Sequence, residues 1–106
     1  GVDGIMSAHL QIPALDSDYP ATLSPKILTE QLRDSLGFAG LIVTDALIMG
    51  AIANRYGNNE AAVLAVAAGA DILLMPPDPV AAIQAICEAV ETGRIPAERI
   101  RASVER

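Results

Sequence analysis

Three short apolar runs punctuate this chain, and each is followed by a loop and then by a longer amphipathic stretch. The runs cover residues 3–8, 41–44 and 72–75, and their length and composition predict short strands. The stretches that follow repeat apolar residues at helical spacing, which predicts a helix after each strand. Three consecutive β-loop-α units predict an α/β fold with parallel strands joined by right-handed crossovers.

A capping residue and a glycine set the bounds of the first predicted helix. Ser24 followed by Pro25 is typical of a helix start, because the hydroxyl caps a free amide and proline presets φ. Gly37 predicts the end of the helix, with Phe38 folded back on it. The buried face is predicted from leucines four residues apart: Leu28, Leu32 and Leu36.

The later helices carry similar boundary signals. We expect Asn58 or Asn59 to cap a helix that ends at Gly69, after a connection that has room for one helical turn. The small face of that helix allows close approach to a sheet and consists of Ala61, Ala62, Ala65 and Ala68. Asp78 is expected to cap the next helix, and a last one begins near Pro96. The apolar stripe predicted for the helix after Asp78 consists of Ile83, Ile86, Cys87 and Val90.

Composition and charge narrow the classes of partner. The chain is 52% hydrophobic and 19% charged, which describes a protein that builds a core. Its net charge of -6, without a Lys/Arg cluster, argues against nucleic acid or an anionic membrane and favours a neutral or polar small ligand. The longest apolar run, 61–70, is too short to span a bilayer. Because Cys87 and His9 are the single cysteine and histidine, an intramolecular disulfide, a multi-cysteine metal site and a two-His metal motif are excluded within this chain. We expect no metal and no cofactor.

Asp45 stands alone as a carboxylate in the apolar stretch GLIVTDALIMG, residues 40–50. Burial of an unpaired carboxylate costs on the order of several kcal/mol, so such a residue is usually excluded, paired or placed where a strand leaves the core. Its position directly after the run 41–44 favours the third case, and α/β enzymes often place reacting groups there. From the residues alone, a cap of the following turn is the commoner role of Asp.

Several segments together carry a resemblance to a known family. They are IMSAHLQIPALD, PATLSPKILTEQLRDSLGFAGLIVTDALIMGAI, EAAVLAVAAGADILLMPPD and GRIPAERIRASVER, in this order over nearly the whole chain. The chain resembles glycoside hydrolase family 3, in particular its β-N-acetylglucosaminidase branch. The resemblance implies a (β/α)8 barrel of roughly 250 residues, of which residues 1–106 form part of the catalytic domain, about three βα units from its C-terminal portion.

The resemblance also implies an activity and a role for Asp45. In the family, the Asp of the T-D-A-L segment is the nucleophile that forms a covalent glycosyl-enzyme, which water resolves with net retention. The implied function is a glycosidase that removes terminal β-linked N-acetylhexosamine or a β-glucose-type residue, with a carbohydrate substrate and no cofactor. Small neighbours on both sides of Asp45 leave room for a sugar ring: Thr44 and Ala46.

Two further residues are candidates for contact with substrate. His9 follows the first predicted strand. It is expected to bind substrate hydroxyls or to orient a neighbour at the site, or else to be satisfied by the backbone at a strand end. Met49 is expected to line an apolar wall of the sugar pocket, together with Met75, although methionine more often fills gaps in a core. Cys87 has no basic neighbour in the sequence and is interpreted as core filler.

Departures from the family pattern concern whether this chain is catalytically active, and not whether it resembles the family. The upstream K-H-F-P-G-H-G segment, whose loop carries general acid/base groups, is not among these residues, and Arg101 stands where the family commonly has Asp. Asp16 and Asp18 are the nearest acidic residues and receive no role. We therefore expect this chain to be a fragment that is inactive alone and that self-associates through the open edges of its sheet.

Two alternatives from other classes stay open at this point. A receiver domain also places an Asp at the tip of a buried strand, but it needs an acidic pair for Mg²⁺ and a Lys at its last strand, whereas Lys26, the single lysine, begins a helix. The other alternative is an interaction module that keeps part of a barrel without chemistry. The residues that precede Gly1 would separate this module from the hydrolase.

Overall fold

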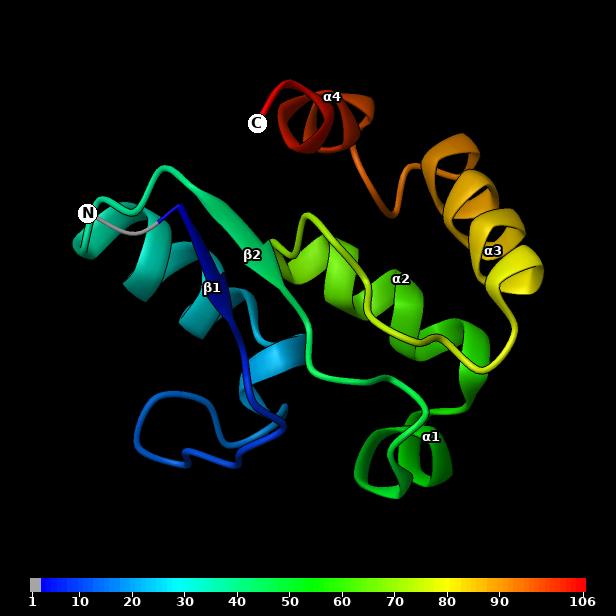
Figure 1. Ribbon diagram of the computed structural model, residues 1–106, viewed down its shortest axis with the longest axis horizontal. Coiled ribbons are helices and arrows are strands. Elements are labelled where there is room, and N and C mark those ends of the chain that lie inside the picture. Colours follow the sequence, from blue (N-terminus) through cyan, green and yellow to red (C-terminus); the bar gives the residue numbers. More distant parts are fainter. Residues whose placement is uncertain (1–2) are drawn as a thin grey trace.

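A two-stranded parallel sheet with helices on one side forms the centre of the molecule (Figure 1). The computed structural model describes residues 3–106, and within that range the side chains of all residues but 50, 51, 53 and 58. Strand β1 is Gly4–Met6 and strand β2 is Leu41–Val43, paired so that Ile5 lies beside Ile42. The predicted α/β class and parallel pairing are confirmed.

The helices of residues 3–106 follow or separate the strands. They are η1 (Ala21–Leu23), η2 (Lys26–Ser35), α1 (Gly50–Tyr56), α2 (Asn58–Ala68), α3 (Pro79–Glu91) and α4 (Ala97–Glu105). Alanines of α2 form the predicted small face, because Ala61, Ala65 and Ala68 belong to the main core. That core joins them to Ile42 of β2 and to Leu23 and Leu28 of η1 and η2. Helices η1, η2 and α2 therefore cover one face of the sheet, and α3 packs on α2 in a second cluster.

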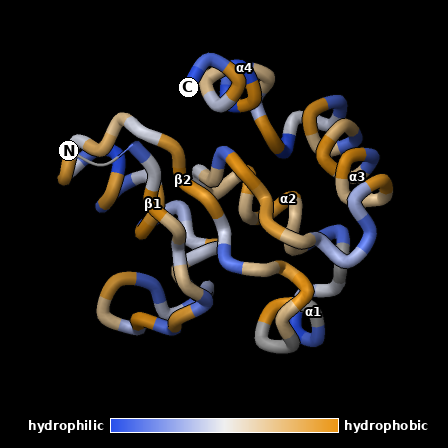
Figure 2. The backbone as a smooth tube through the Cα atoms, viewed as in Figure 1, coloured by the Kyte–Doolittle hydropathy of each residue, from blue (hydrophilic) through white to orange (hydrophobic). Residues whose placement is uncertain are grey.

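The other face of the sheet is uncovered in this chain. Side chains alternate along a strand, so Met6, Leu41 and Val43 point away from the buried face that holds Ile42. Met6 is 58% exposed, and Leu41 and Val43 are half-buried. Hydrophobic colouring in Figure 2 runs along β2 and along the extended segment 72–75 beside it. An apolar face without a cover is thus a property of the sheet.

The third predicted segment, 72–75, runs in the predicted direction but does not form a regular strand. Residues 72–75 run parallel to β2, yet one bridge, Val43 to Ile72, replaces a ladder. The amide of Leu74 donates to the side-chain oxygen of Thr44 at 2.9 Å instead of to a backbone carbonyl. Met75 then takes a φ of 46°, which ends extended geometry. The prediction of a regular strand at 72–75 is therefore wrong.

Helix starts differ from the sequence predictions at one of three positions. The hydroxyl of Ser24 accepts from the amide of Ile27 at 3.1 Å, and the carboxylate of Asp78 accepts from Ala81 at 3.1 Å, as predicted for caps. The prediction that an asparagine precedes the second helix as its cap is wrong, because α2 begins at Asn58 and Gly57 holds the cap position. Gly57 has a φ of 78°, a conformation that favours glycine, and there the chain turns directly from α1 into α2.

Two predicted helix faces are also corrected. Leu28 is in the core and Leu32 packs against it, as predicted. Helix η2 closes with wider i→i+5 hydrogen bonds, such as Leu36 N–H to Gln31, so Leu36 leaves the predicted stripe and is 76% exposed. On α3, Ala82 and Ala89 are buried, which turns Ile83 and Cys87 toward solvent. The interpretation of Cys87 as core filler is therefore wrong. Phe38, as predicted, folds back, and its amide donates to the carbonyl of Leu32.

Gly40 allows the chain entering β2 to pass close to β1. A Cβ at Gly40 would lie 2.3 Å from the carbonyl oxygen of Asp3, whereas one at Gly4 would lie 3.6 Å from the nearest atom, an ordinary contact. We expect Gly40→Ala to lower the free energy of unfolding by about 1–3 kcal/mol, the usual cost of overpacking, because backbone must shift. Urea titration measures this, with Gly4→Ala as the matched control. Equal effects of the two substitutions would contradict the close approach.

Candidate active site

Asp45 lies at the carboxyl end of β2, two residues beyond its last residue. The intervening residue, Thr44, is fully buried and is fixed by its amide, which donates to the carbonyl of Ile72 at 3.0 Å. The Asp45 side chain is half-buried, and its Oδ1 accepts a hydrogen bond from the amide of Ala46 at 2.8 Å. Among the described residues, no donor reaches the second carboxylate oxygen. The backbone thus holds one oxygen of Asp45.

His9 lies at the same end of the sheet as Asp45. It follows β1 by three residues, and β1 and β2 are in register with Met6 beside Val43. Its Nδ1 lies 2.9 Å from the hydroxyl of Thr22, and its Nε2 lies 2.9 Å from the carbonyl oxygen of Ala46. The structure therefore brings His9 to the residue next to Asp45, as the sequence predicted for two strand tips of a parallel sheet.

Met49 and Met75 belong to the same edge of the sheet. The loop after Asp45 runs beside the segment after Ile72, because Leu47 donates to Leu74 and Ile48 donates to Met75, at 2.9 and 3.1 Å. Met49 closes the following turn, with its amide on the carbonyl of Ala46 at 3.2 Å. Both methionines are exposed, 43% for Met49 and 59% for Met75. They are apolar surface at the edge that carries Asp45, and a role for Met49 in substrate binding stays a prediction.

Sequence reasoning missed Thr22 and Ser7 at this end of the molecule. Thr22 is fully buried in η1, and its hydroxyl lies 2.9 Å both from the hydroxyl of Ser7 and from His9. The residues are 13 and 15 positions apart and share no motif spacing. The signal available was weak: a threonine within the run ATLS at a place where neighbours are apolar.

Asp16 is used by the loop between β1 and η1. Its buried carboxylate accepts from the hydroxyl of Ser24 at 2.6 Å and from the amides of Asp18 and Tyr19 at 2.8 and 3.2 Å. The Ser24 hydroxyl and the Asp18 amide hold the pKa of Asp16 below its ordinary value, although burial acts in the opposite direction. A carboxylate stabilised in its charged form inside a turn is a structural group, so Asp16 is not a candidate acid.

The largest cluster of charges lies at the opposite, amino end of β2. The Asp71 side chain, 1% exposed, accepts from the amide of Ile42 at 2.9 Å and from the hydroxyl of Ser103 at 2.6 Å, and it pairs with Arg33. Arg99 of α4 and Arg106, directly after that helix, complete the cluster. Through Asp71, the arginines connect η2 to α4.

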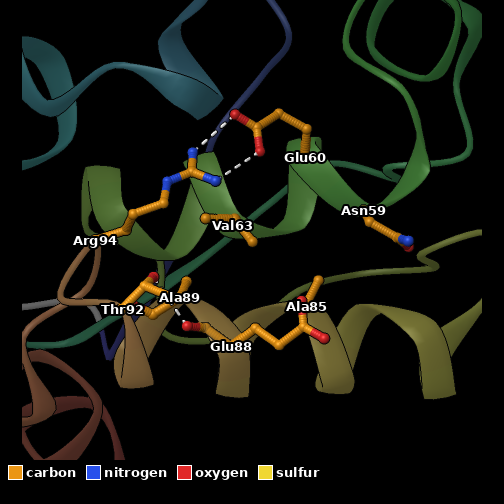
Figure 3. A pocket seen from close by; sticks show the side chains of 8 residues that line it. All are labelled: Asn59, Glu60, Val63, Ala85, Glu88, Ala89, Thr92 and Arg94. Atoms are coloured by element: carbon orange, nitrogen blue, oxygen red, sulfur yellow. Dashed lines mark hydrogen bonds and ion pairs between the residues drawn. The ribbon is translucent and has the colours of Figure 1, made fainter.

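A polar cavity of about 270 Å³ lies between α2 and α3, on the outer layer of the molecule (Figure 3). Glu60 and Arg94 form two parallel hydrogen bonds of 2.8 and 3.0 Å at its margin. That bond pair holds the pKa of Glu60 below its ordinary value. Neither Asp45 nor His9 lines this cavity, so it does not belong to the edge described above.

Within residues 3–106, no helix has the length and apolar character needed to cross a membrane. No three His, Cys, Asp or Glu side chains of the described residues gather as metal ligands would.

Comparison with known proteins decides the family. Residues 1–106 match the glycosyl hydrolase family 3 N terminal domain over the whole chain. The chain belongs to glycosyl hydrolase family 3. This membership removes the receiver-domain alternative and confirms the resemblance found in the sequence.

Relatives of this family 3 chain include solved and curated proteins. A glycoside hydrolase family 3 β-N-acetylglucosaminidase from Paenibacillus sp. str. FPU-7 superposes with a TM-score of 0.95 at 47% identity, over all of this chain and 21% of that one. A β-hexosaminidase of Nitrosomonas eutropha is 38% identical over 90% of this chain and 29% of its own length. An uncharacterized secreted glycosyl hydrolase of Arthroderma benhamiae is 46% identical over 70% of this chain and 21% of its own length. The family 3 chain thus spans between a fifth and a third of these relatives.

Proposed function

We propose that the protein containing this chain is a retaining glycosidase that removes terminal β-linked N-acetylhexosamine, with Asp45 as the nucleophile. Membership of glycosyl hydrolase family 3, together with the position of Asp45 at the carboxyl end of a parallel strand, carries the proposal. Two relatives, a β-N-acetylglucosaminidase and a β-hexosaminidase, support this substrate class. The substrate is a carbohydrate, and the proposal invokes no cofactor.

The chemistry follows from the two oxygens of Asp45. The oxygen that Ala46 does not hold attacks the anomeric carbon, and the bond from that carbon to the leaving oxygen breaks as a general acid donates a proton. Water then loses a proton to the same group, attacks the anomeric carbon and frees Asp45. Two displacements give net retention. We assign no residue of this chain to the acid/base role, because Asp16 is committed to its turn.

The fold part of the proposal is a (β/α)8 barrel, of which these residues supply about three units. The apolar face formed by Met6, Leu41 and Val43 suits the interior of such a barrel, where side chains of neighbouring strands pack in layers. The active edge would then be the carboxyl end of the barrel, where Asp45 and His9 lie. Met49 would form part of the wall of the sugar subsite.

The same uncovered face makes association the expected behaviour of residues 1–106 alone. β1 pairs with β2 on one side, and, among residues 3–106, no strand pairs with its other edge. An open edge beside an apolar face favours pairing with a second copy. We expect light scattering after size exclusion to give a mass above that of one chain, without turnover of substrate. A monomer that turns over substrate would contradict both parts.

The configuration of the released sugar tests the proposed mechanism. The full-length protein is mixed with an aryl N-acetyl-β-glucosaminide, and proton NMR follows the anomeric signals during the first minutes, before mutarotation. We expect the β anomer first, because two inversions at one carbon restore configuration. Initial release of the α anomer would exclude a nucleophilic Asp45, and absence of any hydrolysis would support the interaction module.

A further inference from the structure

His9 contacts protein groups with both of its ring nitrogens. Nδ1 lies 2.9 Å from the hydroxyl of Thr22, and Nε2 lies 2.9 Å from the carbonyl oxygen of Ala46. An imidazole has no further nitrogen with which to bind a ligand. His9 is therefore already satisfied, although it lies at the edge of the sheet that carries Asp45.

The partners of His9 determine which nitrogen carries the proton. A carbonyl oxygen can only accept, so Nε2 must donate to Ala46. In the neutral imidazole, Nδ1 is then an acceptor, and the hydroxyl of Thr22 donates to it. The hydroxyl of Ser7 in turn donates to Thr22 at 2.9 Å. Three hydrogen bonds, each donating toward the next residue, thus connect Ser7, directly after β1, to Ala46.

The last of these hydrogen bonds, from His9 to Ala46, holds the backbone beside Asp45. The peptide between Ala46 and Leu47 is held at its carbonyl by His9 and at its amide by the carbonyl of Leu74, 2.9 Å away. The amide of Ala46 then points to Oδ1 of Asp45 at 2.8 Å. That amide belongs to the preceding peptide, Asp45–Ala46, which shares the Cα of Ala46 with the peptide that His9 holds. The orientation of the carboxylate thus depends on His9 through the backbone of Ala46.

We propose that His9 and Thr22 are positioning residues for Asp45, acting through the backbone of Ala46 and not through contact with the sugar. This inference rests on the proposed role of Asp45 as nucleophile. A nucleophile must meet the anomeric carbon along a narrow approach, and a displacement of about 1 Å can lower the rate about 10²-fold. Thr22 serves as the buried anchor that keeps the His9 ring in one tautomer and one orientation.

Two amide variants of His9 separate the two ring nitrogens. In His9→Gln, the amide nitrogen can replace Nε2 and still donate to Ala46, whereas the shorter side chain of His9→Asn cannot reach that carbonyl. In the full-length protein we expect His9→Asn to lower kcat about 10²-fold with KM within about twofold, and His9→Gln to recover most of the loss. Thr22→Val should lower kcat less than His9→Asn, and Thr22→Ser should behave as wild type, because it keeps the hydroxyl.

The kinetic pattern distinguishes positioning from other roles. If His9 bound the substrate, His9→Asn would raise KM with little change in kcat, and His9→Gln would bring no recovery; this overturns the inference. If His9 only stabilised the fold, thermal unfolding would shift while kcat per folded molecule stayed constant, which overturns it as well. Unfolding midpoints are therefore recorded for all four variants.

A spectroscopic readout keeps the inference separate from the proposed function. Nitrogen NMR of histidine-labelled protein is recorded without substrate and with neutral imidazole. The His9 signal is assigned as the one that is missing from the spectrum of His9→Gln, and it should show a proton on Nε2. A proton on Nδ1 overturns the inference whether or not the protein is a glycosidase. Failure of the wild type to hydrolyse N-acetyl-β-hexosaminides, or full activity of Asp45→Ala, overturns the proposed function and leaves the tautomer result standing.

Discussion

Asp45→Ala in the full-length protein is expected to lower kcat for an aryl N-acetyl-β-glucosaminide by about 10⁴-fold or more, the scale on which loss of a nucleophile acts. Without the carboxylate, no covalent intermediate forms, and water must attack directly. Thermal stability should change little, because Asp45 is half-buried and accepts one described hydrogen bond, from its neighbour Ala46. Release of the aryl group, followed by absorbance, measures the effect.

A matched substitution and a chemical rescue define the control for Asp45. Asp34 is an exposed carboxylate in η2, beside the cavity that Arg99 and Arg106 line at the other end of the sheet, and Asp34→Asn should leave kcat unchanged. Azide added to Asp45→Ala should restore release of the aryl group, because the small anion can attack from the vacated side. The product should be the α-glycosyl azide, since one displacement inverts the anomeric carbon. A β-glycosyl azide, or an active Asp45→Ala, would contradict the role of Asp45.

Asp71→Ala is expected to have the largest effect on stability, about 3–5 kcal/mol in the free energy of unfolding, the usual cost of breaking a buried ion pair. The Asp71 side chain is 1% exposed, and its removal leaves Arg33, 11% exposed, without its carboxylate. The hydroxyl of Ser103 and the amide of Ile42 also lose their acceptor. Urea titration measures the change. Glu60→Gln, which breaks an exposed pair with Arg94, is the control and should have a much smaller effect.

Asp71 also predicts how stability depends on pH. Burial tends to raise the pKa of Asp71, but the Ser103 hydroxyl, the Ile42 amide and the guanidiniums of Arg33 and Arg106 outweigh it and hold the pKa below the ordinary value of 3.8. A carboxyl whose pKa is lower in the folded state contributes stability above its unfolded pKa and loses it as the pH falls through the folded value. Stability of the wild type should therefore fall below about pH 4 more steeply than that of Asp71→Ala. Parallel curves would contradict the lowered pKa.

Local signals in the sequence predicted the elements that depend on near neighbours. Ser24 and Asp78 cap their helices as expected, and the alanines of α2 form the small face that meets the core. Asp45 and His9 could be placed at one edge because parallel strands end on the same side of a sheet. These inferences needed hydrophobic period, capping residues and topology alone.

Other features depended on packing between distant segments and had no local signal. The face of α3 was misjudged because apolar size favoured Ile83 and Cys87, whereas close approach to α2 selects the smaller Ala82 and Ala89. The partners of Asp71 lie 28 to 38 residues away, and nothing in their spacing indicates one cluster. The hydrogen bond from Leu74 to the side chain of Thr44, which interrupts the third strand, has the same origin.

The paired loops beyond the strand ends have a consequence for motion. Leu47 and Ile48 donate to carbonyls of the segment that follows Ile72, so the backbone after Asp45 is bonded across to its neighbour instead of standing free. Amides in such bonds exchange with solvent only when the local structure opens. We therefore expect the amides of Leu47 and Ile48 to exchange slowly, and closure over a bound sugar to come from segments other than this loop.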